Sequence, residues 1–381
     1  MDYKKRIPAK KIVYFVIIFF VALIIIKVSI KIFPCLPAFS GEKNLERKIG
    51  QMILVGFNES DLDGEKSPLR QQIKSGQITG VILLSENLVN PAQVSGLIKK
   101  ITGIRAEQPL FIAIDQEGGS VGRLGANNGF EHFPSCGEVA STKTPEEAYT
   151  IYLRMAKMLQ ETGINLNLAP VVDLDLSPEL TFRDRRRAFS SDPGTVIRFA
   201  REFIAAHRKN NILTAIKHYP GMGSAKSDPH KRGVDVTKVF DDIELYPFSE
   251  LIKEGMADMV MSAHIINSKV DAANPASLSA IHIEKMLKGE MGFRGLVITD
   301  DLLMPAITNQ FSLEESAVKA VSAGNDILLF VYHLDNRKYN DLPRRVIKAI
   351  KRAVNSGEIS DSRIEESFRK IIGSKRALRR N

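Results

Sequence analysis

The stretch Ile212-Leu213-Thr214-Ala215-Ile216-Lys217-His218-Tyr219-Pro220-Gly221-Met222-Gly223 joins an apolar run to two polar residues and a turn. The apolar run predicts a buried strand whose end fixes Lys217 and His218, and the glycines would leave the following loop able to bend. That loop carries Asp228 and, two residues later, His230. A carboxylate beside a histidine orients the ring and raises its basicity, which suits proton transfer. On these residues alone, an active-site loop and an ordinary turn that contains a histidine are equally good interpretations.

The same arrangement recurs along the chain, because apolar runs repeatedly end in polar side chains. These side chains are Asp115, Asp173, Lys217, His218, His264, Asp300 and Asp301. Helical patterns separate the runs, which predicts a parallel sheet covered on both faces. Seven or eight such units in about 340 residues predict an α/β fold, a single (β/α)8 TIM-type barrel, with an open doubly wound sheet as the competing architecture. In a barrel the strand ends share one face, where active sites are built.

The alternation of helical patterns with short apolar runs sets the bounds of the expected elements. We expect a helix over Leu45–Phe57 before the first strand. The expected strands are Gly80–Leu84, Leu110–Asp115, Asn165–Asp173, Ile212–His218, Met259–His264, Gly295–Asp301 and Asp326–Phe330. We interpret the basic tail that begins with Lys375 and Arg376 as a solvated helix end.

The first forty residues differ in character from the rest of the 381-residue chain. They hold seven of its Lys and Arg residues and one acidic residue, so most of the formal net charge of +9 belongs to them. We therefore expect no nucleic-acid partner. The remaining composition, with 44% hydrophobic and 25% charged residues over the whole chain, is typical of a globular domain.

An uninterrupted apolar run, Ile12–Ile26, follows a basic N-terminus. It crosses a hydrocarbon core of ~30 Å only if the helix continues to Phe33 and the intervening lysines reach the interface. We expect residues 1–11 to be a basic cytoplasmic N-terminus, 12–33 a transmembrane signal-anchor or signal peptide, 34–43 a linker and 44–381 the barrel domain. We favour an uncleaved anchor, which makes a single-pass membrane protein with an extracytoplasmic, periplasmic domain. Cleavage near Ala38-Phe39-Ser40 would instead release a secreted protein.

The two cysteines, Cys35 and Cys136, lie in different parts of the chain, so we expect no disulfide between them. We expect Cys136 to be a small buried residue. No cysteine-based metal site is available, and we expect neither a metal nor a cofactor, in a protein that acts as a monomer.

The pattern Lys-His-aromatic-Pro-Gly-x-Gly…Asp-x-His over residues 217–230 resembles the signature of bacterial β-N-acetylhexosaminidases of glycoside hydrolase family 3, of the type that acts in peptidoglycan turnover. Four further stretches resemble motifs of the same family, in family order. They are Asp115-Gln116-Glu117-Gly118-Gly119-Ser120-Val121-Gly122-Arg123, Asn167-Leu168-Ala169-Pro170-Val171-Val172-Asp173, Arg187-Ala188-Phe189-Ser190-Ser191-Asp192-Pro193 and Ile298-Thr299-Asp300-Asp301-Leu302. The resemblance runs from about residue 45 to 335.

The resemblance assigns the catalytic groups. Asp300, directly after Thr299, would be the nucleophile that forms a covalent glycosyl intermediate. Asp301 is the alternative, although a helix N-cap or a partner of Asp300 is the better interpretation. His230 would be the general acid/base and Asp228 its orienting partner, where most glycosidases use a second carboxylic acid.

The resemblance also assigns the sugar-binding positions, which are Asp115, Arg123, Arg187, Lys217 and His218. Carboxylate and cationic side chains suit hydroxyls and an N-acetyl carbonyl in a partly dry pocket. We expect Asp173 and His264 to be structural, with Asp173 bracing neighbouring loops and His264 a buried histidine with satisfied hydrogen bonds. Met222 stands where the family usually has His, and Ser120 where Arg is common, which leaves substrate preference open.

The sequence thus predicts a retaining exo-β-N-acetylglucosaminidase that acts on glycans ending in N-acetylglucosamine, including peptidoglycan fragments. A glycoside phosphorylase of the same fold is one alternative, because a histidine acid/base keeps a carboxylate away from incoming phosphate. A metal-dependent hydrolase is a second, although the chain lacks a His-x-His or His-Glu-x-x-His pair. A non-catalytic, membrane-tethered glycan-binding protein is a third.

Overall fold

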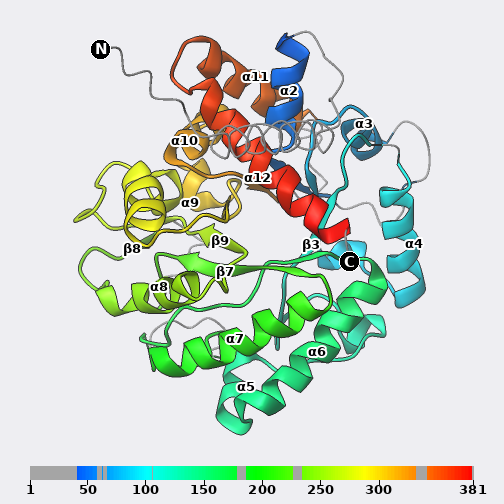
Figure 1. Ribbon diagram of the computed structural model, residues 1–381, viewed down its shortest axis with the longest axis vertical. Helices are drawn as coiled ribbons and strands as arrows, with labels where there is room; N and C mark the ends of the chain where they lie inside the picture. The colour runs from blue at the N-terminus through cyan, green and yellow to red at the C-terminus, as the bar shows by residue number, and fades with distance from the viewer. Residues whose placement is uncertain are drawn as a thin grey trace, which may run out of the picture. The chain divides into compact units, whose positions relative to one another are not determined.

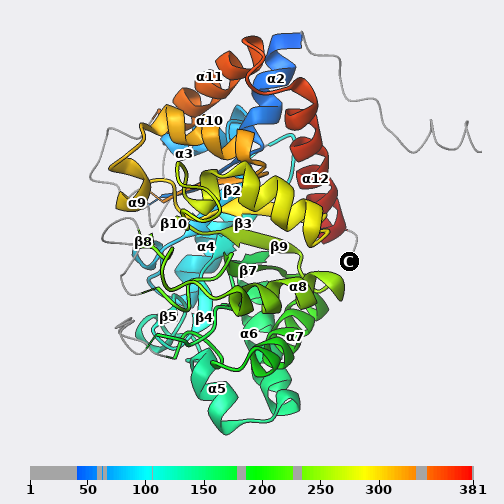
Figure 2. The same cartoon turned by 90° about the vertical axis from the view of Figure 1, so that its left-hand side faces the viewer.

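The computed structural model describes residues 41–57, 62, 67–104, 106–177, 186–225, 234–331 and 341–379. The chain divides into two compact units, Met1–Asn44 and Leu45–Asn381. The strands and the candidate site all belong to the second unit. The ribbon is drawn in Figure 1 and turned by 90° in Figure 2.

Eight strands form one parallel sheet in the order β11-β9-β7-β6-β3-β2-β1-β12. Their bounds are β1 Ile53–Gly56, β2 Gly80–Leu83, β3 Phe111–Ile114, β6 Leu166–Asn167, β7 Leu213–Tyr219, β9 Met259–Ser262, β11 Leu296–Thr299 and β12 Leu328–Phe330. A parallel bridge between Ile298 and Ile327 joins the two end strands, so the sheet nearly closes. The predicted TIM-like barrel is confirmed, and the open doubly wound sheet is wrong.

Side chains at the carboxyl ends of β11 and β12 complete the closure. The Thr299 hydroxyl accepts the Leu329 N–H at 3.0 Å, and Asp301 Oδ1 accepts the Val331 N–H at 2.8 Å. The Leu302 N–H donates to the Leu329 carbonyl at 3.0 Å. The seam of the barrel is therefore held by residues that also border the pocket at this end of the strands.

Helices follow most strands along the chain. Their bounds are α2 Gly41–Gly50, α3 Pro68–Lys74, α4 Pro91–Thr102, α5 Cys136–Thr142, α6 Pro145–Thr162, α7 Pro193–Lys209, α8 Tyr246–Lys253, α9 Pro305–Thr308, α10 Leu313–Ala323, α11 Leu342–Asn355 and α12 Asp361–Arg379. Figure 1 shows α6 and α7 side by side on the outer side of β7. Four-residue strands with every residue buried, such as β3, are what a sheet covered on both faces requires.

Local sequence sets the ends of the longer helices. At α6, Thr144 and Glu147 form a capping box, and Gly163 ends the helix at φ 93°. Ser312, Glu315 and Gly324 do the same for α10. These reciprocal caps satisfy backbone N–H groups that have no partner inside the helix, and the left-handed residue at the end suits glycine.

The first expected element is partly wrong. We expected one helix over Leu45–Phe57, but α2 ends at Gly50 and the chain then forms β1. A Cβ on Gly50 would lie 2.2 Å from the Gly76 carbonyl oxygen, so close packing places this glycine at the turn. The run of β1 is too short to distinguish a strand from a helix end, and its pairing with β2 and β12 decides the outcome.

The structure also differs from the expected strand Asn165–Asp173 and from the expected solvent exposure of Lys375. The expected strand Asn165–Asp173 is regular only over β6, with an isolated bridge from Val171 to Lys217. Pro170 has no N–H to donate and interrupts the ladder. Lys375, expected on a solvated helix end, is only 1% exposed. Cys136 is buried and free, as expected.

Within the described part of the chain, none of the helices combines the length and apolar character needed to cross a membrane. The expected membrane segment, residues 12–33, lies outside the described residues, as do residues 1–11. Those expectations stay predictions.

Candidate active site

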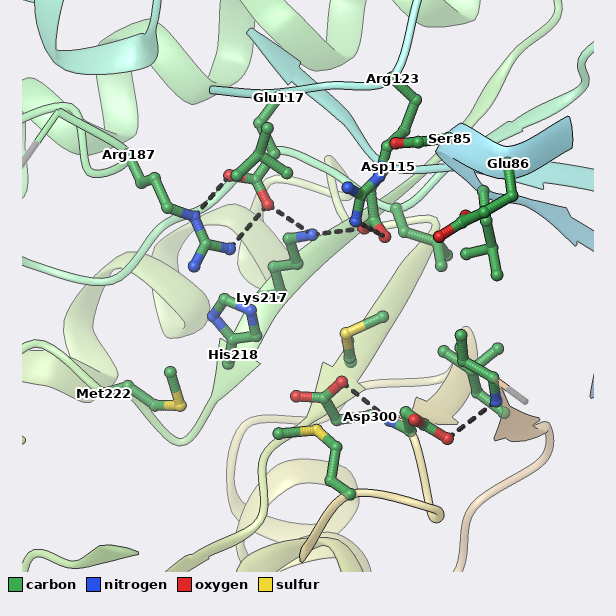
Figure 3. Close-up of a pocket in the computed structure, with 18 residues that line it drawn as sticks. Ser85, Glu86, Asp115, Glu117, Arg123, Arg187, Lys217, His218, Met222 and Asp300 are labelled. Carbon is green, nitrogen blue, oxygen red and sulfur yellow. Dashed lines mark hydrogen bonds and ion pairs between the residues drawn. The ribbon is translucent and has the colours of Figure 1, made fainter. Parts of the chain in front are cut away.

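A cavity of about 300 Å³ lies at the carboxyl ends of the barrel strands. All five expected sugar-binding residues and the expected nucleophile line it, namely Asp115, Arg123, Arg187, Lys217, His218 and Asp300. Figure 3 shows that these side chains approach the cavity from several different strand ends and loops. Six of the predicted site residues, from several parts of the sequence, thus line one pocket at the face where barrel enzymes build their sites, and their roles stay predictions.

Charged side chains form one wall of the pocket. The Arg187 guanidinium donates two hydrogen bonds of 2.8 Å to the Glu117 carboxylate. Lys217 Nζ lies 2.7 Å from Glu117 Oε1 and 2.8 Å from Asp115 Oδ1. Arg123 Nη2 lies 3.9 Å from Asp115 Oδ2 and extends the wall. Figure 3 shows these alternating charges as one continuous row.

This row fixes the protonation of its buried members. Burial alone would raise the pKa of Glu117, but Arg187 and Lys217 outweigh it and hold that pKa well below its ordinary value. Burial would likewise lower the pKa of Lys217, but Asp115 and Glu117 raise it above the usual range. Glu117 and Lys217 are thus held in their ionised forms, in a network of opposite charges that is preorganised to donate and accept hydrogen bonds.

Asp300 lies directly after β11 and faces the same cavity. Its N–H donates to the Ser262 carbonyl at 2.9 Å, and its Oδ1 accepts the Asp301 N–H at 2.8 Å. Burial would raise the pKa of this carboxyl, but the nearby His264 and His218 rings and the Asp301 N–H together lower it. An ionised carboxylate on a rigid strand end can attack an electrophilic carbon.

Asp173 braces the turn after β7, as expected. Its Oδ2 lies 2.7 Å from His218 Nδ1, and its Oδ1 accepts the N–H groups of His218 and Met222 at 3.1 and 3.0 Å. A carboxylate can only accept, so Nδ1 of His218 carries a proton. The ring and the turn are therefore held by one carboxylate.

Asp301 lines the pocket beside Asp300 but is engaged in backbone contacts. Its Oδ1 accepts the N–H groups of Leu303 and Val331 at 2.9 and 2.8 Å. Burial raises the pKa of Asp301 to about 7, against the lowering effect of those two hydrogen bonds. Asp301 is thus a partner of Asp300 through its own N–H, one of the two expected alternatives, and it is not a helix N-cap, because Met304 holds that position in α9.

Asp228 and His230 lie outside the described residues, so their assignment as the acid/base pair stays a prediction. The described chain on either side is firmly held. Ala225 and Val234 are both buried in one apolar cluster. Glu244 accepts the Gly223 N–H at 2.6 Å and the Ser224 hydroxyl at 2.5 Å. The segment that bears the two residues thus starts and ends at fixed points.

Sequence reasoning missed the role of Glu117. It is 1% exposed and sits at the centre of the charged wall, although the sequence pattern marks it only as one position of a motif. A second carboxylate two residues after the strand-end Asp115 was the available signal. Ser85 and Glu86, after β2, also line the cavity and carried no motif.

Apolar side chains also line the pocket. They are Leu84, Val121, Leu168, Met222, Met261, Met304, Leu329 and Val331. Met222, which departs from the family pattern, is therefore a lining residue. In the part of the chain that the structure describes, no group of three His, Cys, Asp or Glu side chains is placed to hold a metal ion.

A charged wall, apolar lining residues and a carboxylate of lowered pKa at the mouth of a parallel barrel are typical of a barrel enzyme with a pocket suited to a hydroxyl-rich ligand. The chain belongs to glycosyl hydrolase family 3, since the pattern described as "Glycosyl hydrolase family 3 N terminal domain" matches residues 44–373. The resemblance seen in the sequence is thereby confirmed, and the protein is a glycoside hydrolase of this family.

Two curated relatives are named β-hexosaminidase. The Tolumonas auensis protein is 35% identical over 282 residues, which cover 73% of this chain and 81% of the relative. The Alkalilimnicola ehrlichii protein is 31% identical over 338 residues, which cover 86% and 92%.

Solved structures agree. A family 3 β-N-acetylglucosaminidase from Paenibacillus sp. str. FPU-7 has a TM-score of 0.80 and 32% identity, with 90% of this chain covered. The chain spans 64% of that protein's length. A β-N-acetylhexosaminidase from Beutenbergia cavernae has a TM-score of 0.78 and 26% identity, and 89% of this chain and 99% of that chain are covered.

Proposed function

We propose that this protein is a retaining exo-β-N-acetylglucosaminidase that removes terminal β-linked N-acetylglucosamine through a covalent intermediate on Asp300. One observation carries the proposal: Asp300, a partly buried carboxylate whose pKa is lowered, shares a cavity with the charged wall of Asp115, Glu117 and Lys217. The names of the relatives support the same substrate class. The cavity volume of about 300 Å³ supports cleavage at a chain end, because it lies at the low end of ligand pockets.

In the first step the Asp300 carboxylate attacks the anomeric carbon, and the bond from that carbon to the leaving-group oxygen breaks. His230, oriented by Asp228, donates its proton to the departing oxygen. In the second step His230 takes a proton from water, and the water oxygen attacks the anomeric carbon. Asp300 leaves as a carboxylate, and two inversions give net retention.

The charged wall would bind and orient the sugar. Asp115 would accept hydrogen bonds from hydroxyls, while Lys217, Arg187 and Arg123 would donate to hydroxyl and carbonyl oxygens. His218, whose Nδ1 proton is held by Asp173, would present its other ring nitrogen. Since Glu117 and Asp115 already pair with the two cations Arg187 and Lys217, these four residues can bind a neutral sugar without leaving an uncompensated charge among them.

The test is turnover of chromogenic aryl glycosides that differ only at the 2-position, with and without phosphate. We expect hydrolysis of the 2-acetamido compound alone, with a hexose rather than a hexose phosphate as product. Asp300→Asn should lower kcat by about three orders of magnitude or more. Asp301→Asn is the matched control, and equal rates in wild type and Asp300→Asn would refute the assignment. Loss confined to Asp301→Asn would transfer the role to Asp301.

We also propose that the natural substrates are peptidoglycan fragments and that the monomeric protein is anchored through residues 12–33 with its domain in the periplasm. The basic flank and apolar run at the N-terminus support the anchor and its orientation. N-terminal sequencing of the mature protein distinguishes an anchor from a cleaved leader that yields a secreted enzyme. Protease added to cells with an intact inner membrane, from the periplasmic side, checks on which side of that membrane the domain lies. Digestion of the domain only after the inner membrane is opened would contradict the proposal.

A further inference from the structure

His264 lies behind Asp300 and contacts the chain on which Asp300 is carried. It follows β9, whose Ser262 pairs in register with Thr299 of β11. The ring is 1% exposed, with Nδ1 2.7 Å from the Ser277 hydroxyl and Nε2 2.8 Å from the Asp301 carbonyl oxygen. The ring therefore bridges the end of β9 to the residue after the candidate nucleophile.

The partners of the ring determine its protonation pattern. A carbonyl oxygen only accepts, so Nε2 of His264 carries a proton. Ser277 either donates to Nδ1 of a neutral ring or accepts from Nδ1–H of a charged ring. His264 can thus gain a positive charge while keeping its hydrogen bonds to Ser277 and Asp301.

His207 provides the contrast. It is also fully buried, and its ring nitrogens lie 2.8 Å from the Phe203 carbonyl oxygen and 3.0 Å from Asn167 Nδ2. Its ring stacks on Phe203 at 4.2 Å, and burial lowers its pKa to about 4. His207 is a neutral packing residue, and it does not line the pocket that Asp300 lines.

We propose that His264 is a positioning residue for Asp300: its hydrogen bond to the Asp301 carbonyl fixes the Asp301–Leu302 peptide, and with it the backbone that carries Asp300, and its ring favours the ionised form of the Asp300 carboxylate. This inference rests on the proposed function, in which Asp300 is the nucleophile. The charged or titratable groups around Asp300 are His264 after β9, His218 and Lys217 from β7, and the neighbouring Asp301. Of the groups that lower the pKa of Asp300, His264 has the largest effect.

The experiment compares His264→Gln with His207→Gln in the full-length protein. A glutamine amide can still donate to the Asp301 carbonyl, but it cannot become charged. We expect His264→Gln to lower kcat at least about 10-fold with a smaller change in KM, because His264 orients the nucleophile rather than the sugar. The acid limb of the kcat/KM profile, which reports the free enzyme, should move to higher pH.

His207→Gln should reduce the melting temperature without moving the acid limb. Ser277→Ala is the second variant, because it keeps the His264 ring and removes only one partner. It should shift the acid limb in the same direction by a smaller amount. A folded His264→Gln protein with wild-type kcat and an unmoved acid limb would overturn the inference.

The Asp300→Asn variant separates the two proposals. If Asp300→Asn is inactive while His264→Gln behaves as wild type, only the positioning role of His264 fails. If Asp300→Asn is as active as wild type, the proposed nucleophile fails, and the role of His264 fails with it.

Discussion

Glu117 is the residue on which the charged wall depends. Its carboxylate contacts both Arg187 and Lys217 at distances below 3 Å while being 1% exposed. A buried carboxylate between two cations is stable only while all three groups are present, because removal of one leaves a buried charge without its partner. The wall is therefore a single unit, and no part of it is an independent sugar contact.

Glu117→Gln should accordingly affect stability and catalysis together. We expect a loss of about 3–5 kcal/mol in the free energy of unfolding and a large rise in KM, because Arg187 and Lys217 lose their shared anchor. Chemical denaturation and aryl-glycoside kinetics measure the two effects. The control is Glu138→Gln, whose carboxylate lies 4.0 Å from Arg186 and is 47% exposed, and which should leave both quantities almost unchanged. Wild-type KM in Glu117→Gln would contradict the argument.

The pH dependence of the Glu117 contribution follows from its pKa. Because the folded-state pKa lies well below the unfolded value, the stabilisation is present above the unfolded value near ~4.3. It is lost as pH falls through the folded-state pKa. Wild type should therefore lose its advantage over Glu117→Gln only in strongly acidic solution.

At the scale of elements, the strand ends were predictable and the turns between them were not. Hydrophobic runs that end in Asp115, Lys217 or Asp300 signal both a strand and a site, because one short segment determines both. β1 was missed because pairing with β2 and β12, and not its own composition, makes it a strand. Glu117 was missed because its role depends on Arg187, seventy positions away in the sequence.

The turn after β7 shows a second limit. Its glycines looked like a source of flexibility, yet Gly223 is required for close approach. A Cβ on Gly223 would lie 1.9 Å from the Leu174 carbonyl oxygen, and one on Gly221, at φ 128°, would lie 2.7 Å from Glu244 Cβ. Sequence cannot distinguish a glycine that permits motion from one that permits contact, because the contact partner is remote.

Gly223→Ala tests this interpretation. The methyl group must displace backbone, so we expect a loss of about 1–3 kcal/mol in stability and at least a 10-fold fall in kcat/KM. The activity falls because the adjacent Met222 lines the pocket. The control is Gly96→Ala in α4, where a Cβ meets nothing within 4 Å and alanine should stabilise by up to about 1 kcal/mol. A Gly223→Ala protein with wild-type activity and stability would show that the turn can accommodate a methyl group, and would contradict the interpretation.

At the scale of the whole domain, the two ends of the barrel have different roles. The carboxyl ends of the strands carry the pocket, whereas the amino ends are closed by α12. Lys375 of α12 donates to Gln51 Oε1 and to the Thr79 carbonyl, each at 2.8 Å, just ahead of β1 and β2. Its ammonium also lies 5.0 Å from the centre of the Phe111 ring. Sequence reasoning assigned Lys375 to solvent because a lysine near a basic tail usually is solvated.

Lys375→Met separates stability from chemistry, because Lys375 lies at the end of the barrel away from the pocket. Burial lowers the pKa of Lys375 well below its ordinary value, so folding disfavours the charged form. The contribution of Lys375 is most favourable above the unfolded pKa of ~10.4 and is lost as pH falls through the folded-state value. Wild type should therefore gain stability relative to Lys375→Met as pH rises from about 7 to 9. Denaturation at several pH values measures this, with the 75% exposed Lys253→Met as control. The kcat of folded Lys375→Met should equal that of wild type. A lower kcat in a fully folded Lys375→Met protein would show that contacts at the amino ends of the strands affect the pocket.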